Sequence, residues 1–267
     1  MAYNYTNKVI WITGASSGIG EALAYAFSRR GAWLILSSRR SEELERVRMA
    51  CAHPDVVKVI PLDLLNMGSF AGKVAEAIGA FGRIDILVHN GGVSQRSLVM
   101  ETSLGVQRMV MELDYFSYVA LTQAVLPHFA ERRSGHFVVV SSVMGKIGTP
   151  MRSAYAAAKH ALHGFFDCLR AEVVSLGIGV TMLTPGYVQT NIAMHVVTKD
   201  GSPLGKASVN IEKGLRADKA ADQIVRAVAR RKYETYIGKM GPERVALWVS
   251  RWFPGILFRL APRFAPK

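Results

Sequence analysis

The sequence predicts an α/β fold, a doubly wound parallel sheet with helices on both faces, in three layers. Two observations predict it. Short apolar runs alternate along the 267 residues with segments whose apolar residues recur at helical spacing, and the first run, Val9–Thr13, leads through a glycine-rich loop into such a segment. Strands alternating with helices form parallel sheets whose connections cover both faces. The expected architecture is therefore a single domain of the Rossmann type.

The elements follow in order along the chain. Seven apolar runs are expected to form buried strands, at residues 9–13, 32–36, 57–62, 84–89, 136–141, 180–184 and 234–237. Helical spacing begins at Ile19 and recurs at 68–81, 104–132, 154–175 and 219–231. Residues 187–210 are polar and irregular, which favours a substrate lid. We expect a catalytic domain over 1–241 and a separate C-terminal extension over 242–267.

The composition excludes several classes of protein. The chain is 50% hydrophobic and 20% charged, which excludes a disordered chain. Its two cysteines, Cys51 and Cys168, form no disulfide framework and favour a reducing compartment. No signal-peptide core and no apolar window of membrane-spanning length occurs, so a cytoplasmic location is expected. The histidines have no acid or cysteine spaced to complete a metal site, so none is expected.

The glycine-rich loop predicts a dinucleotide site. It reads Thr13-Gly14-Ala15-Ser16-Ser17-Gly18-Ile19-Gly20 and joins the first expected strand to the first helix. Glycines permit a tight turn and the close approach of a pyrophosphate, and a helix N-terminus offers free N–H donors to it. An ordinary solvent-exposed turn is the alternative interpretation, but the position at the chain start between strand and helix favours the cofactor.

The end of the second strand favours NADP(H) over NAD(H). A carboxylate there would bind the ribose hydroxyls of NAD. The chain instead reads Ser37-Ser38-Arg39-Arg40. The two guanidiniums of Arg39 and Arg40 can bind a 2′-phosphate, and no acid repels it.

A Ser, Tyr and Lys pattern predicts acid–base chemistry. Ser142 follows the fifth expected strand, Tyr155 comes 13 residues later, and Lys159 follows at i+4 on the same helix face. A neighbouring ammonium favours the phenolate form of a tyrosine, which makes the pair a usable acid–base catalyst. Tyr-x-x-x-Lys alone is common on exposed helices. It predicts a catalytic site here because Ser142 and the glycine loop occur with it.

These motifs together resemble the short-chain dehydrogenase/reductase family over residues 7–238. The match extends to Asp63-Leu64, to Asn90-Gly91-Gly92, and to Pro185-Gly186-Tyr187-Val188-Gln189-Thr190. The segments 139–146 and 160–166 further resemble the member 7 (7B-like) branch, which is related to 11β-hydroxysteroid dehydrogenase type 1.

The resemblance implies a role for each matched residue. Tyr155 exchanges a proton with the substrate oxygen, Ser142 places that oxygen, and Lys159 supports the tyrosine and binds the nicotinamide ribose. The remaining cofactor contacts that it implies are Gly14, Ser16, Ser17, Gly18, Ile19, Gly20, Arg39, Arg40, Asp63, Leu64, Asn90, Gly91, Gly92, Pro185, Gly186, Val188 and Thr190. It also implies a homodimer or homotetramer built through the helices at 104–132 and 154–175.

One residue departs from the family pattern at the site. Asp114 stands where the family carries a catalytic Asn, whose main-chain carbonyl holds a water in a proton relay. A side-chain change need not destroy that relay. A carboxylate near Lys159 is instead expected to raise the pKa of the lysine. We expect an active enzyme with an altered pH profile.

The substrate is expected to be a small molecule with a bulky, apolar body that carries a carbonyl or a secondary alcohol, such as a steroid, retinoid or lipid-like compound. Three segments, 94–100, 143–152 and 187–210, are expected to line its pocket, with Met144 and Tyr187 beside Ser142 and Tyr155. They are apolar and rich in methionine, which suits an adaptable pocket. Their apolar members are Val99, Met100, Val143, Met144, Ile147, Met151, Ile192, Met194 and Val196.

The C-terminal extension concentrates the positive charge. The chain carries a net charge of +13, of which +7 lies in residues 230–267. Val245, Trp248, Val249, Trp252 and Phe253 form one apolar helix face, with Arg244 and Arg251 off it. Such a helix is typical of a membrane interface, and peripheral contact through 243–264 is one expectation. Packing on a partner subunit or over the substrate pocket is the other. Nucleic-acid binding is not expected, because no binding motif is present.

Two functions from different classes remain. The first is an NADP(H)-dependent oxidoreductase, and the second is a non-catalytic dinucleotide-binding sensor or scaffold at a membrane surface. The intact spacing of Ser142, Tyr155 and Lys159 favours the enzyme.

Overall fold

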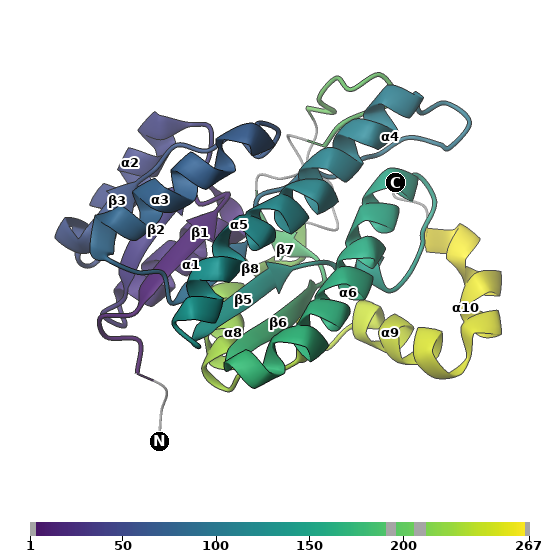
Figure 1. The fold of residues 1–267 in the computed structure, drawn as a ribbon. Coiled ribbons are helices and arrows are strands. Elements are labelled where there is room, and N and C mark those ends of the chain that lie inside the picture. Colours follow the sequence, from purple (N-terminus) through teal and green to yellow (C-terminus); the bar gives the residue numbers. More distant parts are fainter. Residues whose placement is uncertain (1–3, 191–195, 206–211, 265–267) are drawn as a thin grey trace.

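The computed structural model describes residues 4–190, 196–205 and 212–264. Its main sheet has seven parallel strands in the order β3-β2-β1-β4-β5-β6-β9 (Figure 1). These strands are β1 (Val9–Thr13), β2 (Trp33–Ser37), β3 (Val57–Val59), β4 (Ile86–His89), β5 (Gly135–Val140), β6 (Ile178–Pro185) and β9 (Glu234–Ile237). All seven expected strands are present, and the predicted doubly wound sheet is confirmed.

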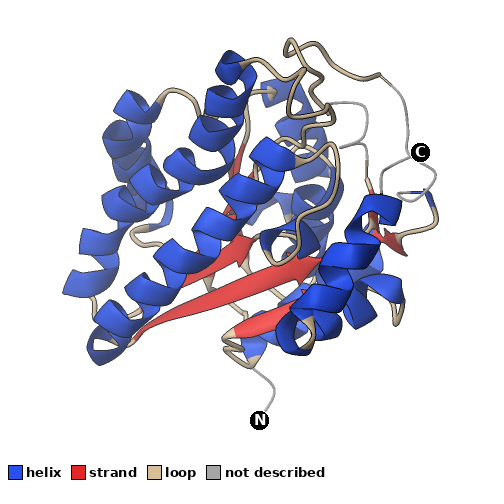
Figure 2. Ribbon diagram, turned by 90° about the vertical axis from the view of Figure 1, so that its right-hand side faces the viewer, coloured by secondary structure: helices blue, strands red, loops and turns tan. Residues whose placement is uncertain are grey.

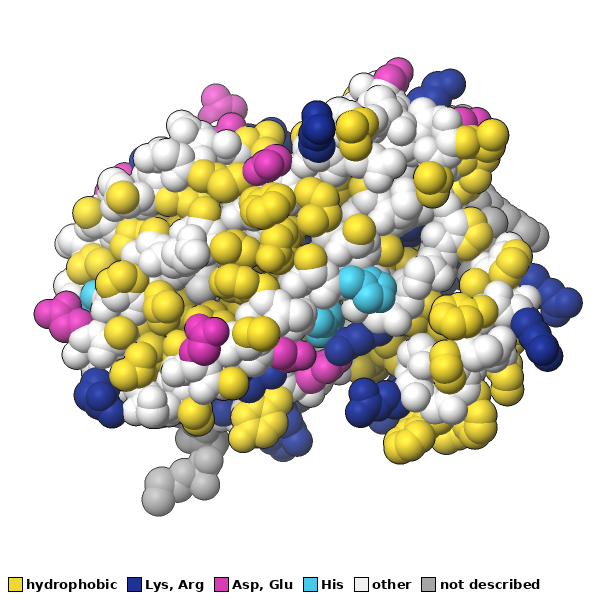
Figure 3. All heavy atoms as spheres, turned by 45° about the vertical axis from the view of Figure 1, so that its right-hand side comes forward, with side chains coloured by type: hydrophobic (Ala, Val, Ile, Leu, Met, Phe, Trp, Pro, Cys, Tyr) yellow, Lys and Arg dark blue, Asp and Glu magenta, His cyan; other side chains and the backbone are white. Residues whose placement is uncertain are grey.

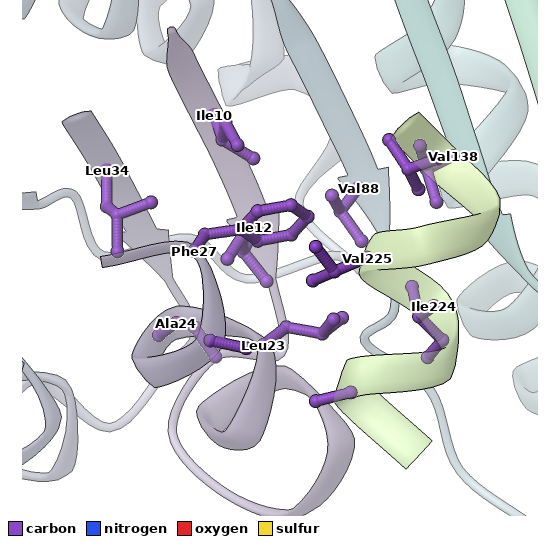
Figure 4. Packing of buried hydrophobic residues seen from close by; sticks show 14 of the residues in the cluster. Ile10, Ile12, Leu23, Ala24, Phe27, Leu34, Val88, Val138, Ile224 and Val225 are labelled. Atoms are coloured by element: carbon purple, nitrogen blue, oxygen red, sulfur yellow. The ribbon is translucent and has the colours of Figure 1, made fainter. Parts of the chain in front are cut away.

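Two hydrophobic cores lie on opposite faces of the sheet, because successive strand residues point to opposite sides. Ile10 and Ile12 of β1 belong to one core, with α1 (Gly18–Ser28), α2 (Ser41–Met49) and α8 (Ala217–Ala229) (Figure 4). Val9 and Trp11 belong to the other, with α3 (Phe70–Phe81), α5 (Ser117–Glu131) and α6 (Ser153–Val173). Figure 2 shows the resulting helical layers around the strands. The single three-layer domain follows from this alternation.

The helix expected over 104–132 is present, and it contains a π-helical turn that the sequence did not predict. It consists of α4 (Leu104–Met111), a single π-helical turn (Glu112–Phe116) and α5. A π turn inserts an extra residue while the apolar spacing continues on both sides, so periodicity does not reveal it. Asp114 lies within this turn.

The predicted lid falls partly outside the described residues. Its described part contains β7 (Val188–Gln189), which pairs with β8 (Leu215–Arg216). Val197 bridges to Gln95 and to Pro203. Ile192 and Met194, two of the expected pocket residues, lie outside the described residues.

The C-terminal extension forms α9 (Pro242–Trp252) and α10 (Pro254–Leu260), followed by a short 3-10 turn, Ala261–Phe264. Figure 1 shows both helices, in yellow, at the right-hand side of the main body. Leu257 of α10 packs on Val143 and Ile147, with Ala246 and Val249 of α9 at the edge of that cluster. None of the described helices is both long and apolar enough to cross a bilayer.

Candidate active site

A cavity of about 1240 Å³ joins the glycine loop to the Ser, Tyr and Lys residues. It lies where the carboxyl ends of β1, β4 and β5 meet, which is the usual ligand position in an open parallel sheet. Of the residues assigned from the sequence to the cofactor and to catalysis, all but Gly20 line this cavity, as do Met144 and Tyr187.

The glycine loop is packed too closely for side chains. A Cβ on Gly14 would lie 2.5 Å from Cα of Gly91, and one on Gly20 would lie 2.3 Å from the carbonyl oxygen of Gly14. Asn90 holds the loop by donating its side-chain amide to the carbonyl oxygens of Thr13 and Gly14, at 3.1 and 3.2 Å. The helix that follows begins at Gly18 with no side-chain cap, so its first N–H groups remain available to an anion. This cradle fits a pyrophosphate.

Arg40 lies directly at the glycine loop. Its Nη2 donates to the hydroxyls of Ser16 and Ser17, at 3.0 and 3.2 Å. Arg39 and Arg40 are both exposed and both line the cavity. The loop and the end of β2 therefore present two guanidiniums and two hydroxyls to the cavity. Among the acidic residues in the described lining of the cavity, Asp63 is the nearest in sequence to these arginines.

Ser142, Tyr155 and Lys159 lie together at the other end of the cavity. The Ser142 hydroxyl accepts a hydrogen bond from the N–H of Met144 at 3.1 Å, which leaves its proton free to donate. Lys159 is buried at 4% exposure, and its Nζ lies 5.6 Å from the centre of the Tyr155 ring. The i, i+4 spacing on α6 produces this pairing.

Asp114 forms a buried ion pair with Lys159. Its Oδ2 lies 3.2 Å from Nζ, and the side chains are 0% and 5% exposed. The other oxygen, Oδ1, accepts the N–H of Val93 at 2.8 Å. Gly92 gives the carboxylate its space, since a Cβ there would lie 3.0 Å from Oδ1.

The ion pair controls the charge on Lys159. Burial by itself would lower the pKa of Lys159, but the Asp114 carboxylate outweighs it, and the pKa of Lys159 lies above its ordinary value. Burial raises the pKa of Asp114 above its ordinary value, although Lys159 and the Val93 N–H oppose this shift. Because the two charges are in contact and the carboxylate has a backbone donor, we assign the charged pair.

Two further side chains at the site, Tyr118 and Arg152, were given no role from the sequence, although Arg152 ends the segment 143–152 that was expected to line the pocket. The Tyr118 hydroxyl donates to the carbonyl oxygen of Gly91 at 2.9 Å, and Nζ of Lys159 lies 5.2 Å from the centre of its ring. Tyr118 lies four residues after Asp114, and this helical spacing could have indicated that both side chains face the site. Arg152 also lines the cavity, and its side chain donates to Ser94. No local pattern gave Arg152 a specific role.

The expected pocket residues divide into two groups. Val143, Met144, Ile147, Tyr187 and Val196 line the cavity. Val99 and Met100 were wrongly expected there and are 65% and 90% exposed. Their segment forms a surface turn in which the carbonyl oxygen of Leu98 accepts the N–H groups of residues 101 and 102. Met151 is likewise absent from the described lining.

The two histidines near the site, His89 and His163, are buried side chains with structural contacts. His89 is buried under Tyr118, its Nε2 pairs with the Thr122 hydroxyl at 2.9 Å, and burial lowers its pKa to about 3. His163 contacts the Ser141 hydroxyl at 3.1 Å, and burial lowers its pKa to about 4. Over residues 4–190, 196–205 and 212–264, no group of three or more metal-ligating side chains is assembled.

Comparisons with known proteins identify the family of this chain. The family model for short chain dehydrogenases matches residues 8–201. "Dehydrogenase/reductase SDR family member 7B" of Danio rerio is 41% identical and covers 99% of this chain and 87% of its own. The protein of that name from Mus musculus is 39% identical, covering 98% of this chain and 82% of its own.

Two solved structures share the fold. A short-chain dehydrogenase from Streptomyces avermitilis has a TM-score of 0.82 and 30% identity, covering 95% of this chain and 94% of its own. A short chain dehydrogenase/reductase from Burkholderia phymatum, in complex with NAD, has a TM-score of 0.82 at 22% identity, covering 95% and 96%. The chain belongs to the short-chain dehydrogenase/reductase family, in its member 7B-like branch, and is a nicotinamide-dinucleotide-dependent oxidoreductase.

Proposed function

We propose that the protein interconverts a carbonyl and a secondary alcohol on a bulky, largely apolar small molecule with NADP(H). The observation that carries the proposal is the meeting of Ser142, Tyr155 and Lys159 with the glycine loop in one cavity. A non-catalytic sensor has no need for a free serine hydroxyl and a buried lysine beside a tyrosine ring.

Each of the three side chains has a distinct task. Tyr155 gives its phenolic proton to the carbonyl oxygen during reduction and takes it back during oxidation. Ser142, whose hydroxyl oxygen already accepts the Met144 N–H, donates to the same substrate oxygen. The Lys159 cation favours the phenolate after the proton has left. The bound dinucleotide supplies or accepts the hydride.

The preference for NADP(H) rests on Arg39 and Arg40. The Arg40 guanidinium donates hydrogen bonds to the hydroxyls of both serines of the glycine loop. A ribose 2′-phosphate bound there would accept hydrogen bonds from the same guanidinium. Arginine binds phosphate through a planar pair of donors, and two arginines favour the more negatively charged cofactor.

The apolar part of the substrate would lie against Val143, Ile147 and Leu257, which form one hydrophobic cluster on the cavity wall. Ala246 of α9 lines the same region. The C-terminal helices thus complete the pocket, which favours a bulky hydrophobic ligand.

We further propose that the C-terminal helices contact a membrane surface. Val245, Trp248 and Trp252 are 61%, 58% and 65% exposed, and Phe258 of α10 is 72% exposed. Figure 3 shows hydrophobic side chains with basic ones beside them on the C-terminal helices at the right of the molecule. Aromatic and basic residues together suit an anionic lipid surface. A homodimer or homotetramer through the 104–132 and 154–175 helices is proposed from the family resemblance.

The enzyme proposal is tested by NADPH absorbance decay with a panel of apolar ketones and aldehydes. Tyr155→Phe should lower kcat by at least about 100-fold, because the proton donor is lost. Tyr233→Phe, a 74% exposed tyrosine, is the matched control and should retain full activity. Equal rates for wild type and Tyr155→Phe would contradict the proposal.

A further inference from the structure

We propose that Arg152 forms an anion-binding subsite in the substrate pocket, so that the substrate carries a carboxylate or similar anionic group on its apolar body. This rests on the proposed function and specifies its substrate class. Arg152 lies directly before α6 and three residues before Tyr155, and both line the cavity. Arg152 is the residue that precedes the first turn of the helix, and Tyr155 lies in that turn, so an anion on Arg152 would bind in the same cavity as the reacting carbonyl.

Arg152 is held in place without being neutralised. Its Nη1 donates to the hydroxyl of Ser94 at 2.7 Å, and Ser94 is only 4% exposed. No carboxylate of the described residues lies within ion-pair distance of Arg152, whereas Lys159 in the same cavity has Asp114. A half-buried guanidinium with a neutral partner retains charge and donors for an anionic ligand.

The backbone around Arg152 is strained. Met151, the preceding residue, has a φ of +65° in the left-handed region. Its carbonyl oxygen accepts the N–H of Ser97 at 3.1 Å, which fixes the strained residue against the segment that contains Ser94. Such strain persists where surrounding structure enforces it and is concentrated at ligand sites. Here it directs the chain so that Arg152 meets Ser94.

A second arginine, Arg96, lies close to Arg152. The backbone N–H of Arg96 bonds to Val197, and the Val197 N–H bonds to Ser94, so Arg96 lies on the same strip of chain. Partial burial and the nearby Arg152 guanidinium lower the pKa of Arg96. An anion on Arg152 would relieve this repulsion.

The whole cavity is electropositive. Its described lining includes seven basic side chains, Arg39, Arg40, Arg152, Lys159, Lys213, Lys239 and Arg263, and three acidic ones, Asp63, Asp114 and Glu243. Arg39 and Arg40 lie at the glycine loop and are assigned to the cofactor. Arg152 instead bonds to Ser94 and directly precedes the helix that carries Tyr155, so a cofactor phosphate at the glycine loop does not account for it.

The test compares 4-oxododecanoate with its methyl ester, which differ in the anionic group. Wild type should reduce the acid with the higher kcat/KM. Arg152→Gln, which can still bond to Ser94, should raise KM for the acid at least tenfold, with kcat within twofold and the ester unchanged. Arg152→Lys should recover part of the loss. The control is Arg216→Gln, whose exposed partner is Asp218, and it should alter neither substrate. Equal effects of Arg152→Gln on acid and ester, or no effect, would overturn the subsite.

A binding measurement separates the subsite from the reaction. With NADPH present, decanoate should raise the Tm of wild type more than methyl decanoate does, and Arg152→Gln should abolish that difference. If wild type reduced neither ketone but this difference held, the proposed function would fail while the subsite stood. Equal Tm shifts for wild type and Arg152→Gln would reject the subsite whatever the turnover.

Discussion

The charge around Tyr155 depends on one residue, Asp114. Because its carboxylate contacts Lys159 at 3.2 Å, the pair presents little net charge to the tyrosine ring, which lies 5.6 Å from Nζ. An asparagine at this position would leave the lysine charge uncompensated. The π turn that carries Asp114 and the bare Gly92 beside it make room for the carboxylate.

Asp114→Asn is therefore expected to shift the pH dependence of the reaction. An uncompensated Lys159 cation favours the phenolate, so the pH at which alcohol oxidation reaches half its maximal rate should fall, by on the order of one unit. The loss of Asp114 also lowers the pKa of Lys159, since the carboxylate is what raises it. Full pH–rate curves measure both effects. Glu112→Gln, an exposed acid in the same π turn, should leave the curve in place. An unchanged curve for Asp114→Asn would reject this role.

Arg39 is expected to set cofactor preference. Arg39→Asp should lower the ratio of kcat/KM for NADP(H) to that for NAD(H) by about tenfold or more, or about 1.4 kcal/mol, because a carboxylate repels the 2′-phosphate and can bind ribose hydroxyls. Steady-state kinetics with both cofactors measure the ratio. Arg29→Asp makes the same charge change at the far end of α1 and should leave it unaltered. A ratio that stayed constant in Arg39→Asp would contradict the NADP(H) assignment.

Glycine is sterically required at one position and replaceable at another. In the loop before α1, Gly14 has a φ of +65° and faces the Gly91 backbone, whereas a Cβ added to Gly79 in α3 would meet nothing within 4 Å. Gly14→Ala should lose about 2 kcal/mol of unfolding free energy and bind NADPH more weakly. Gly79→Ala should gain about 0.5–1 kcal/mol, since it removes chain entropy from the unfolded state. Urea unfolding and NADPH titration measure both. A stable, fully binding Gly14→Ala would show that the cradle is not rigid.

Apolar periodicity predicts the elements that the sheet buries. The seven strands and the helices α1, α3, α6 and α8 all fall within the expected ranges or within a few residues of them, because each presents an apolar face to a core. The periodicity could not show the π turn, because the apolar spacing resumes after it. The composition of residues 94–100 wrongly predicted that Val99 and Met100 line the pocket, since an exposed turn and a pocket wall can have the same composition.

At the scale of the molecule, the C-terminal extension has two faces. Leu257 packs over Val143 and Ile147 beside the cavity, while Trp248 and Trp252 are exposed. The extension therefore contributes to the wall of the cavity and presents an aromatic, basic surface, which is compatible with the proposed membrane contact.

Removal of residues 242–267 should release the protein from vesicles that contain anionic lipids, because the aromatic face and its basic residues are lost together. Trp248→Ser/Trp252→Ser tests the face with the charge and the packed Leu257 retained, and should also reduce co-sedimentation. Met49→Ser replaces a 62% exposed residue on α2 and is the control. Vesicle binding that survives both changes would rule out the extension as the contact.

The sequence by itself determined the parallel sheet, the glycine loop, the two arginines after β2 and the Ser, Tyr and Lys spacing. Each is a local pattern, because strand and helix periodicity and short motifs involve residues close in the chain. The family resemblance placed Asp114 near Lys159, but only the tertiary structure showed the buried ion pair between them. It alone also decided that Arg152 would bond to Ser94, 58 residues away, and that Leu257 of the C-terminal extension would pack on Val143 and Ile147. These contacts join elements that are distant in sequence, and they form only because the packing of the sheet and helices brings those elements to the same edge.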